Sequence, residues 1–226
     1  GNKILIITEK GINVLNSNTG KSLLTLDIKG IWNSYKDDYQ NLWLGSNADG
    51  IYFLGNINNP FKCIFPKPVW CLMPDGNNMW AVGNTALYLL STDKLLDTYP
   101  LSKEYSGIVL SMQKEDNDHL VLAIAGRLVR FDIQTGSFSE IKYRNKAIAA
   151  ITFYKDKQNC IWIATNSGIY SLRNGKAFYE YKLNKILGNQ VTNCIRIDAV
   201  GNIWIGTIEN GIYIFDRYHR FFRHLT

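Results

Sequence analysis

The sequence lacks the features that mark several large classes of protein. No run of apolar residues is long enough to span a bilayer, and the first residues do not have the layout of a signal peptide. No segment keeps a 3.6-residue apolar period, so we expect essentially no long helix. The chain begins inside a strand-like run, and we expect it to be cut from a longer protein.

Concentrated positive charge is also missing. The formal net charge is +6 over 226 residues, and the lysines and arginines are scattered along the chain. Nucleic-acid binding needs a concentrated basic patch with aromatic platforms, so we expect no nucleic-acid partner. The four cysteines form no C-x-x-C pair, so a zinc site or redox motif is not expected. Buried free thiols are the first interpretation, and a disulfide stays open in an oxidising compartment; these residues are Cys63, Cys71, Cys160 and Cys194.

Catalytic and metal-binding patterns are not discernible. His119, His219 and His224 do not have the spacing of a metal-binding pair, and no Ser-His-Asp or Cys-His arrangement is visible. A series of aspartates recurs along the chain, but each lies in a separate turn, so the series cannot converge on one ion. We interpret these aspartates as turn formers and predict no catalytic residue, no metal and no cofactor.

What the sequence does contain is one motif, repeated along nearly its whole length. In the clearest copy Asp198 and Gly201-Asn202 supply turn chemistry, and residues 203–206 are apolar on both faces, as in a strand covered on both sides. Gly211 interrupts this run, and residues 212–215 resume as a second strand. Clear copies lie at 156–170 and 37–52, and a weaker copy lies at 75–88.

The spacing of the copies predicts the fold. The marker position of the motif recurs every roughly forty residues, and each period holds four short strand signals, as in a propeller blade. We therefore predict an all-β propeller of four-stranded antiparallel blades with about six blade repeats. The marker residues are Leu5, Trp43, Trp80, Val121, Trp162 and Trp204. The predicted blades are a partial one at 1–29, without its innermost strand, and full ones at about 30–66, 67–106, 107–146, 147–190 and 191–226.

The recurring tryptophans have two interpretations. They could form a ladder that stacks on sugar rings, but each lies in the middle of a strand that is covered on both faces. We therefore interpret Trp43, Trp80, Trp162 and Trp204 as core residues. On that interpretation Trp204→Ala should destabilise the fold by roughly 3–5 kcal/mol.

A second set of residues is the candidate for ligand binding. Trp32 and Trp70 each lie five residues before a turn aspartate, at the start of an innermost strand that lines the central channel. The loops between second and third strands, and those between blades, open on the same face. Tryptophan, asparagine, aspartate and arginine together suit a sugar, although channel plugging is an open alternative. The candidates are Trp32, Trp70, Asn47, Asp49, Arg144, Asn166, Glu209 and Asn210.

The pattern D-x-x-G-N-x-W-I-G-T followed by N-G-I-Y resembles the two-component regulator propeller repeat. Residues 198–216 carry the pattern closely, 156–172 nearly so, and 37–54 with Gln-Asn in place of Gly-Asn. The copies at 75–90 and 116–131 are degenerate, and 4–15 keep only the second half. The resemblance implies the periplasmic sensor of a hybrid two-component system, with seven-bladed propellers and a histidine kinase in the parent inner-membrane protein. It also implies that any membrane contact is made by parts outside this segment.

Three functions follow as hypotheses. The first is a non-catalytic propeller that senses an oligosaccharide, and the second is a structural or protein-interaction propeller. The third is an enzyme such as a lyase or a quinone-dependent dehydrogenase, whose D-x-x-T-G hairpins resemble those at Asp132 and Asn16. Because the first blade lacks a strand and no spare strand fills the gap, we expect an incomplete ring. Such a chain should self-associate or pack against remaining blades of its parent.

Overall fold

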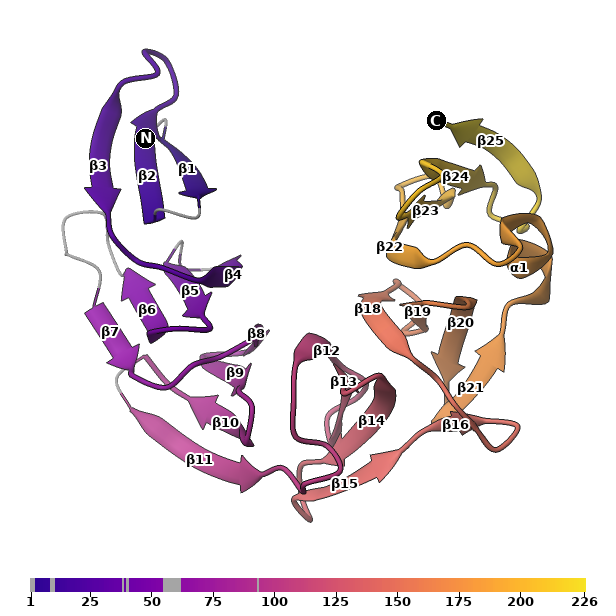
Figure 1. The fold of residues 1–226 in the computed structure, drawn as a ribbon, viewed down its shortest axis with the longest axis horizontal. Helices are drawn as coiled ribbons and strands as arrows, with labels where there is room; N and C mark the ends of the chain where they lie inside the picture. The colour runs from indigo at the N-terminus through magenta and orange to yellow at the C-terminus, as the bar shows by residue number, and fades with distance from the viewer. Residues whose placement is uncertain (1–2, 9–10, 38, 40, 55–61, 93) are drawn as a thin grey trace. The chain divides into compact units, whose positions relative to one another are not determined.

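The computed structural model describes residues 3–8, 11–37, 39, 41–54, 62–92 and 94–226. The chain divides into two compact units, Gly1–Ile108 and Val109–Thr226, which are described separately. Within the described ranges the strands pair antiparallel in every sheet, and each large sheet follows chain order (Figure 1). The prediction of an all-β chain is confirmed.

The first unit holds three sheets. One sheet has three strands, and the other two have four strands each. The three-stranded sheet is β1 (Lys3–Thr8), β2 (Gly11–Asn16) and β3 (Ser22–Leu26). The next is β4 (Ile31–Lys36), β5 (Leu42–Ser46), β6 (Gly50–Leu54) and β7 (Lys62–Phe65). The third is β8 (Cys71–Asp75), β9 (Asn78–Val82), β10 (Ala86–Leu90) and β11 (Leu95–Pro100).

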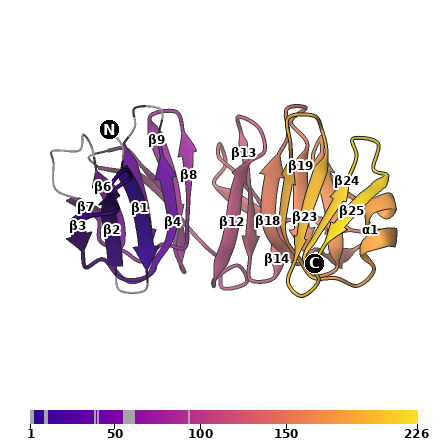
Figure 2. The same ribbon diagram turned by 90° about the horizontal axis from the view of Figure 1, so that it is seen from above.

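The second unit holds three four-stranded sheets and one small hairpin. Its strands lie side by side within each sheet (Figure 2). The first sheet is β12 (Val109–Lys114), β13 (His119–Ile124), β14 (Arg127–Asp132) and β15 (Ser137–Glu140). The second is β18 (Ala150–Lys155), β19 (Ile161–Thr165), β20 (Gly168–Arg173) and β21 (Lys176–Tyr179), and the third is β22 (Thr192–Ile197), β23 (Ile203–Thr207), β24 (Ile212–Phe215) and β25 (Phe221–Leu225). The hairpin is β16 (Lys142–Tyr143) and β17 (Lys146–Ala147).

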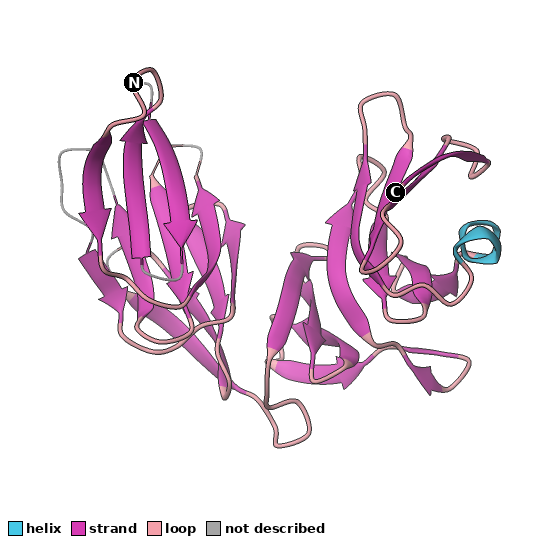
Figure 3. Cartoon of the chain, turned by 45° about the horizontal axis from the view of Figure 1, so that its top comes forward, coloured by secondary structure: helices cyan, strands magenta, loops and turns pink. Residues whose placement is uncertain are grey.

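Two elements were not predicted. One is the β16–β17 hairpin, and the other is a short helix, α1 (Tyr181–Leu187), which follows β21 (Figure 3). Leu183 and Leu187 share one face of this helix and are buried in the core beside β19 and β23. The side-chain amide of Asn184 exchanges two hydrogen bonds with the backbone of Ile169, at 2.7 and 2.8 Å. The helix is therefore attached to β20 through the side chain of Asn184. The prediction of no long helix is confirmed in the described residues.

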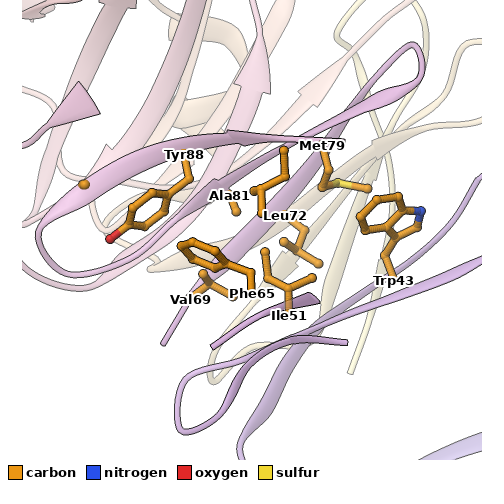
Figure 4. Packing of buried hydrophobic residues seen from close by; sticks show 10 residues of the cluster. Trp43, Ile51, Phe65, Val69, Leu72, Met79, Ala81 and Tyr88 are labelled. Atoms are coloured by element: carbon orange, nitrogen blue, oxygen red, sulfur yellow. The ribbon is translucent and has the colours of Figure 1, made fainter. Parts of the chain in front are cut away.

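The core lies between neighbouring sheets. In the first unit Trp43 and Ile51 pack against Leu72, Met79 and Ala81 of the next sheet (Figure 4). In the second unit the β18–β21 sheet packs in the same way against the β22–β25 sheet. A strand between two such layers is apolar on both faces, which is why residues around the recurring tryptophan do not alternate with polar ones.

The burial of the tryptophans corrects one prediction. Trp43, Trp80 and Trp162 are 2%, 1% and 4% exposed, so their assignment to the core is confirmed. Trp204 is 37% exposed, so its assignment to the core is wrong. The β22–β25 sheet covers Trp162, but no other sheet in the described residues of the second unit covers Trp204. The expected cost of Trp204→Ala falls accordingly, because a half-exposed ring loses less contact on truncation.

The turn aspartates have a second partner that the sequence analysis missed. Asp156 Oδ1 accepts hydrogen bonds from the backbone amides of Gln158 and Cys160, which confirms the turn interpretation. Its other carboxylate oxygen, Oδ2, accepts a hydrogen bond from the indole Nε1 of Trp162 at 2.8 Å. The aspartate thus fixes the turn and also satisfies the only polar group of a buried ring.

The cysteines are only partly as expected. All four are free thiols, and Cys71 and Cys160 are buried. Cys63 and Cys194 are exposed, so the expectation that all four are buried is wrong. Cys63 lies on β7, the last strand of its sheet, and Cys194 of β22 lies on the same sheet face as Trp204 of β23. The face around Cys194 carries no further sheet in the described residues of the second unit, whereas Cys63 pairs with Tyr52 on the face that packs against the β1–β3 sheet.

Candidate functional site

The first unit brings Trp32 and Trp70 into contact. Trp32 lies on β4 and Trp70 directly precedes β8, so each occupies the start of the first strand of its sheet. Their ring centroids are 5.7 Å apart and the rings meet edge to face. Trp32 is 63% exposed, which is high for a ring of this size. The pair therefore presents an aromatic surface to solvent instead of filling the core.

Amide side chains lie at the same end of these sheets. The backbone amide of Asn47 donates to the carbonyl of Gly30 at 2.9 Å, which places Asn47 beside the start of β4. Gly30 has a φ of 62°, which glycine adopts without strain, and a Cβ there would displace the side chain of Asn47. Asp49 is exposed in the same turn, where its backbone amide donates to Oγ of Ser46 at 2.9 Å.

Asn84 belongs with this group, although it was not among the candidate residues. The indole Nε1 of Trp70 donates to Oδ1 of Asn84, so the amide orients the ring. Asn84 follows β9 as Asn47 follows β5, and this equivalence in the repeat is the signal that identifies it. The arrangement combines an exposed aromatic pair with two amides, and these are the groups that recognise a polar ligand with flat apolar faces.

The other four candidate residues lie in the second unit. All four are exposed, and they occupy three different turns: Arg144 between β16 and β17, Asn166 between β19 and β20, and Glu209 with Asn210 between β23 and β24. The Arg144 guanidinium lies 5.3 Å from the ring centroid of Tyr143. The structure therefore places Trp32, Trp70 and Asn47 at the same end of the first unit's sheets, and the ligand role of all eight candidates stays a prediction.

Clefts occur at the opposite end of the sheets, where no candidate was predicted. In the first unit a cleft of about 310 Å³ lies beside the Asp37 turn and is lined by Tyr35, Tyr39 and Trp43. Burial raises the pKa of Asp37, but hydrogen bonds from Trp43 and Asn41 outweigh it, so the pKa lies below its usual value. In the part of the chain that the structure describes, no group of three or more His, Cys, Asp or Glu side chains could hold a metal ion.

Comparison with known proteins identifies the repeat. Residues 185–209 match the family model of the two-component regulator propeller. The resemblance is confirmed. The matched residues begin within the last turn of α1, include β22 and the Asp198 turn, and end in the loop after β23. No curated protein matches the chain.

Solved structures show the same fold at low sequence identity. The extracellular domain of BT4673 from B. thetaiotaomicron, named as a hybrid two-component system, is 17% identical with a TM-score of 0.72. That match covers 99% of this chain but only 30% of the BT4673 chain. A catalytically inactive virginiamycin B lyase from Staphylococcus aureus with Quinupristin is 16% identical, with a TM-score of 0.73 and coverage of 98% and 80%. The computationally designed Ika8 protein is 12% identical, with a TM-score of 0.73 and coverage of 100% and 71%.

These comparisons show the fold. The sheets are propeller blades, as predicted, and the number of blades in a complete ring stays a prediction. The likeness to the lyase is a likeness of fold and carries no statement about catalysis. No helix in the described residues has the length and apolar character that crossing a membrane needs.

Proposed function

We propose that this chain is a non-catalytic, ligand-sensing propeller of a two-component signalling protein, and that its ligand is an oligosaccharide. The observation that carries the proposal is the exposed Trp32–Trp70 pair with Asn84 on the indole of Trp70. The regulator propeller match at 185–209 supports the signalling role. The likeness to extracellular domains supports a periplasmic location in a membrane-anchored parent.

The chemistry of the pair favours a sugar. A sugar ring offers flat C–H faces that stack on an indole and hydroxyl groups that need both donors and acceptors. Asn47 and Asn84 supply amides, each of which can donate and accept. Calorimetric titration with a panel of saccharides tests the proposal, together with a turnover assay on the same panel. Binding without turnover supports a sensor, whereas turnover of any member would support the enzyme hypothesis.

The uncovered face of the last blade favours an interaction scaffold as the second candidate. The Trp162 face is covered by Ile195, Ile203 and Ile205 of the following blade. The equivalent face around Trp204 carries Ile212, which is 39% exposed, and no other blade in the described residues of the second unit covers it. We propose that this face takes another blade of the same repeat, because the following blade supplies the apolar residues that pack against Trp43 and Trp162. That blade belongs to the parent chain or to a second copy.

A further inference from the structure

A cleft of about 600 Å³ lies in the second unit, beside the turn that begins at Asp116. It lies between the β12–β15 and β18–β21 blades, at the end of the sheets where the turn aspartates lie. Sequence reasoning placed no candidate there. Its walls carry six charged or titratable side chains and three asparagines, but no aromatic ring. The residues used below are Glu115, Arg130, Lys155, Asn117, Asn159 and Asn174.

Several polar side chains of the cleft already contact one another, in one ion pair and one histidine–carboxylate contact. Arg130 makes two hydrogen bonds to the carboxylate of Glu115, both at 2.8 Å, and a third to the carbonyl of Gly175 at 3.0 Å. The ring Nδ1 of His119 lies 2.8 Å from the carboxylate of Asp116. These pairs hold the two blades and the Asp116 turn in place, so they form a fixed frame around the cleft.

Lys155 is a cation of the cleft that lies outside these two pairs. Its ammonium donates to the carbonyls of Lys114 and Glu115, at 3.2 and 2.8 Å. In the described residues no carboxylate lies within ion-pair distance of it. An ammonium has three N–H donors, so one donor and a full positive charge are left for a ligand. The two carbonyls also hold the side chain in one orientation, which lowers the entropy that binding would cost.

The three asparagines indicate which functional groups the ligand carries besides an anionic one. Asn117, Asn159 and Asn174 are exposed, and their side-chain amides make no hydrogen bond to any other described residue. Asn159 and Asn174 have positive φ values of 62° and 47°, and this turn conformation sets the direction of their Cα–Cβ bonds. An amide satisfies a hydroxyl group, which donates and accepts, better than it satisfies a second anion, which only accepts. Without an aromatic ring, stacking on a neutral sugar is not available here.

We propose that this cleft binds a small hydroxylated carboxylate, a sugar acid such as a hexuronate, with its carboxylate on Lys155 and its hydroxyls on the three asparagines. The site lies in the other unit from Trp32 and Trp70, and it does not depend on the function proposed for that pair.

Calorimetric titration of the whole chain with galacturonate tests the proposal. Galacturonate should bind, and Lys155→Gln should weaken it by roughly tenfold or more, because a hydrogen bond to a charged group is lost. Asn159→Gly and Asn174→Gly keep the positive φ and should each weaken binding. Asn145→Gly is the matched control, since Asn145 has a φ of 62° in a turn outside the cleft and should leave binding unchanged. A thermal melt of each variant shows that it is folded.

Three results would overturn the proposal. One is no binding of galacturonate at about 10 mM, the weak end of measurable affinities. Another is equal binding of neutral galactose, since the charge of Lys155 would then play no part. The third is displacement of galacturonate by inorganic phosphate at equal concentration, which would indicate a simple anion site. If Lys155→Gln does not fold, the two glycine variants alone decide, because unchanged binding in both contradicts the role of the amides.

Discussion

Nε1 of Trp162 donates a hydrogen bond to Oδ2 of Asp156 at 2.8 Å, joining a buried ring to the turn that precedes its strand. The same bond recurs in three other blades, at 3.0 to 3.1 Å, between Asp37 and Trp43, Asp75 and Trp80, and Asp198 and Trp204. In the blade that has Val121 in place of tryptophan, the carboxylate of Asp116 lies 2.8 Å from the ring Nδ1 of His119. In each of these four blades a hydrogen bond therefore joins the turn aspartate to the tryptophan of the following strand. In the blade without the tryptophan, the aspartate contacts a histidine instead.

Removing the turn aspartate should lower the free energy of unfolding by a larger amount where the tryptophan bonded to it is buried. Asp156→Ala leaves the indole N–H of Trp162 without a partner in a ring that is only 4% exposed. We expect a loss of ~1–3 kcal/mol in the free energy of unfolding. Asp198→Ala removes the same turn bonds beside the exposed Trp204, where water can replace the carboxylate, and should cost less. Urea unfolding of both variants checks this order, and equal losses would contradict it.

Truncating the tryptophans themselves should follow the same order. Trp162→Ala removes a ring packed against Ile195 and Ile205 and should destabilise by roughly 3–5 kcal/mol. Trp204→Ala should cost distinctly less, because more than a third of that ring already contacts water. Denaturant midpoints of the two variants provide the measurement. A Trp204→Ala loss as large as that of Trp162→Ala would mean that the Trp204 face is covered in solution.

Acid should weaken the second unit through His219. This residue lies in the β24–β25 turn and contacts Trp162 edge to face at 5.5 Å. Burial lowers the pKa of His219 below its ordinary 6.5, and nearby positive charge adds to this, while Glu180 at 3.9 Å acts in the opposite direction. The charged groups that influence it are Glu180, Lys182, Arg173 and Asp216.

The sign of the effect follows from proton binding. Below about pH 6.5 the unfolded chain binds a proton at this position before the folded chain does, so stability falls as the pH falls. His219→Asn tolerates the positive φ of 63° at this position and should flatten the pH dependence of the thermal midpoint between about pH 7 and 5. Hydrogen bonds hold the pKa of Asp37 below 3.8, so its contribution is lost only at still lower pH. An unchanged profile in the variant would contradict the role of His219.

The Trp204 face should bind another blade. Light scattering over a range of concentrations should show self-association, or a longer chain that carries further repeats should melt higher than this one. Trp204→Glu should reduce self-association, because a carboxylate cannot enter an apolar interface without a large desolvation cost. Phe222→Glu, an equally drastic change at an exposed position of β25, is the control. A strictly monomeric chain that melts as high as the longer one would contradict the interaction.

The fold was largely predictable because its signals are local. Turn residues and apolar runs recur at fixed offsets, so the strands on either side of Gly211 could be placed from the sequence. The exposure of Trp204 could not, because it depends on whether another blade covers the face and not on the motif itself. Helix α1 was missed because its buried positions, Leu183 and Leu187, give only one helical repeat, which is too short to show a period.

The candidate site was predictable in part for a similar reason. Trp32 and Trp70 occupy equivalent positions in successive blades, so the sequence alone placed them at the same end of neighbouring strands. Their contact depends on side-chain conformations, which a sequence pattern does not fix. The cleft around Lys155 was missed because its residues are separated by tens of positions and meet only when two blades pack.

The central claim is that the Trp32–Trp70 pair binds a sugar. The most direct test is calorimetric titration of the chain, and of Trp32→Ala, with the saccharide that binds best in the panel. Losing one stacked ring should weaken binding by roughly tenfold or more, since aromatic contacts contribute ~1–3 kcal/mol. Phe222→Ala, which removes an exposed ring in the other unit, should leave affinity unchanged. Binding that survives Trp32→Ala and Trp70→Ala, or no binding by any saccharide, would contradict the claim.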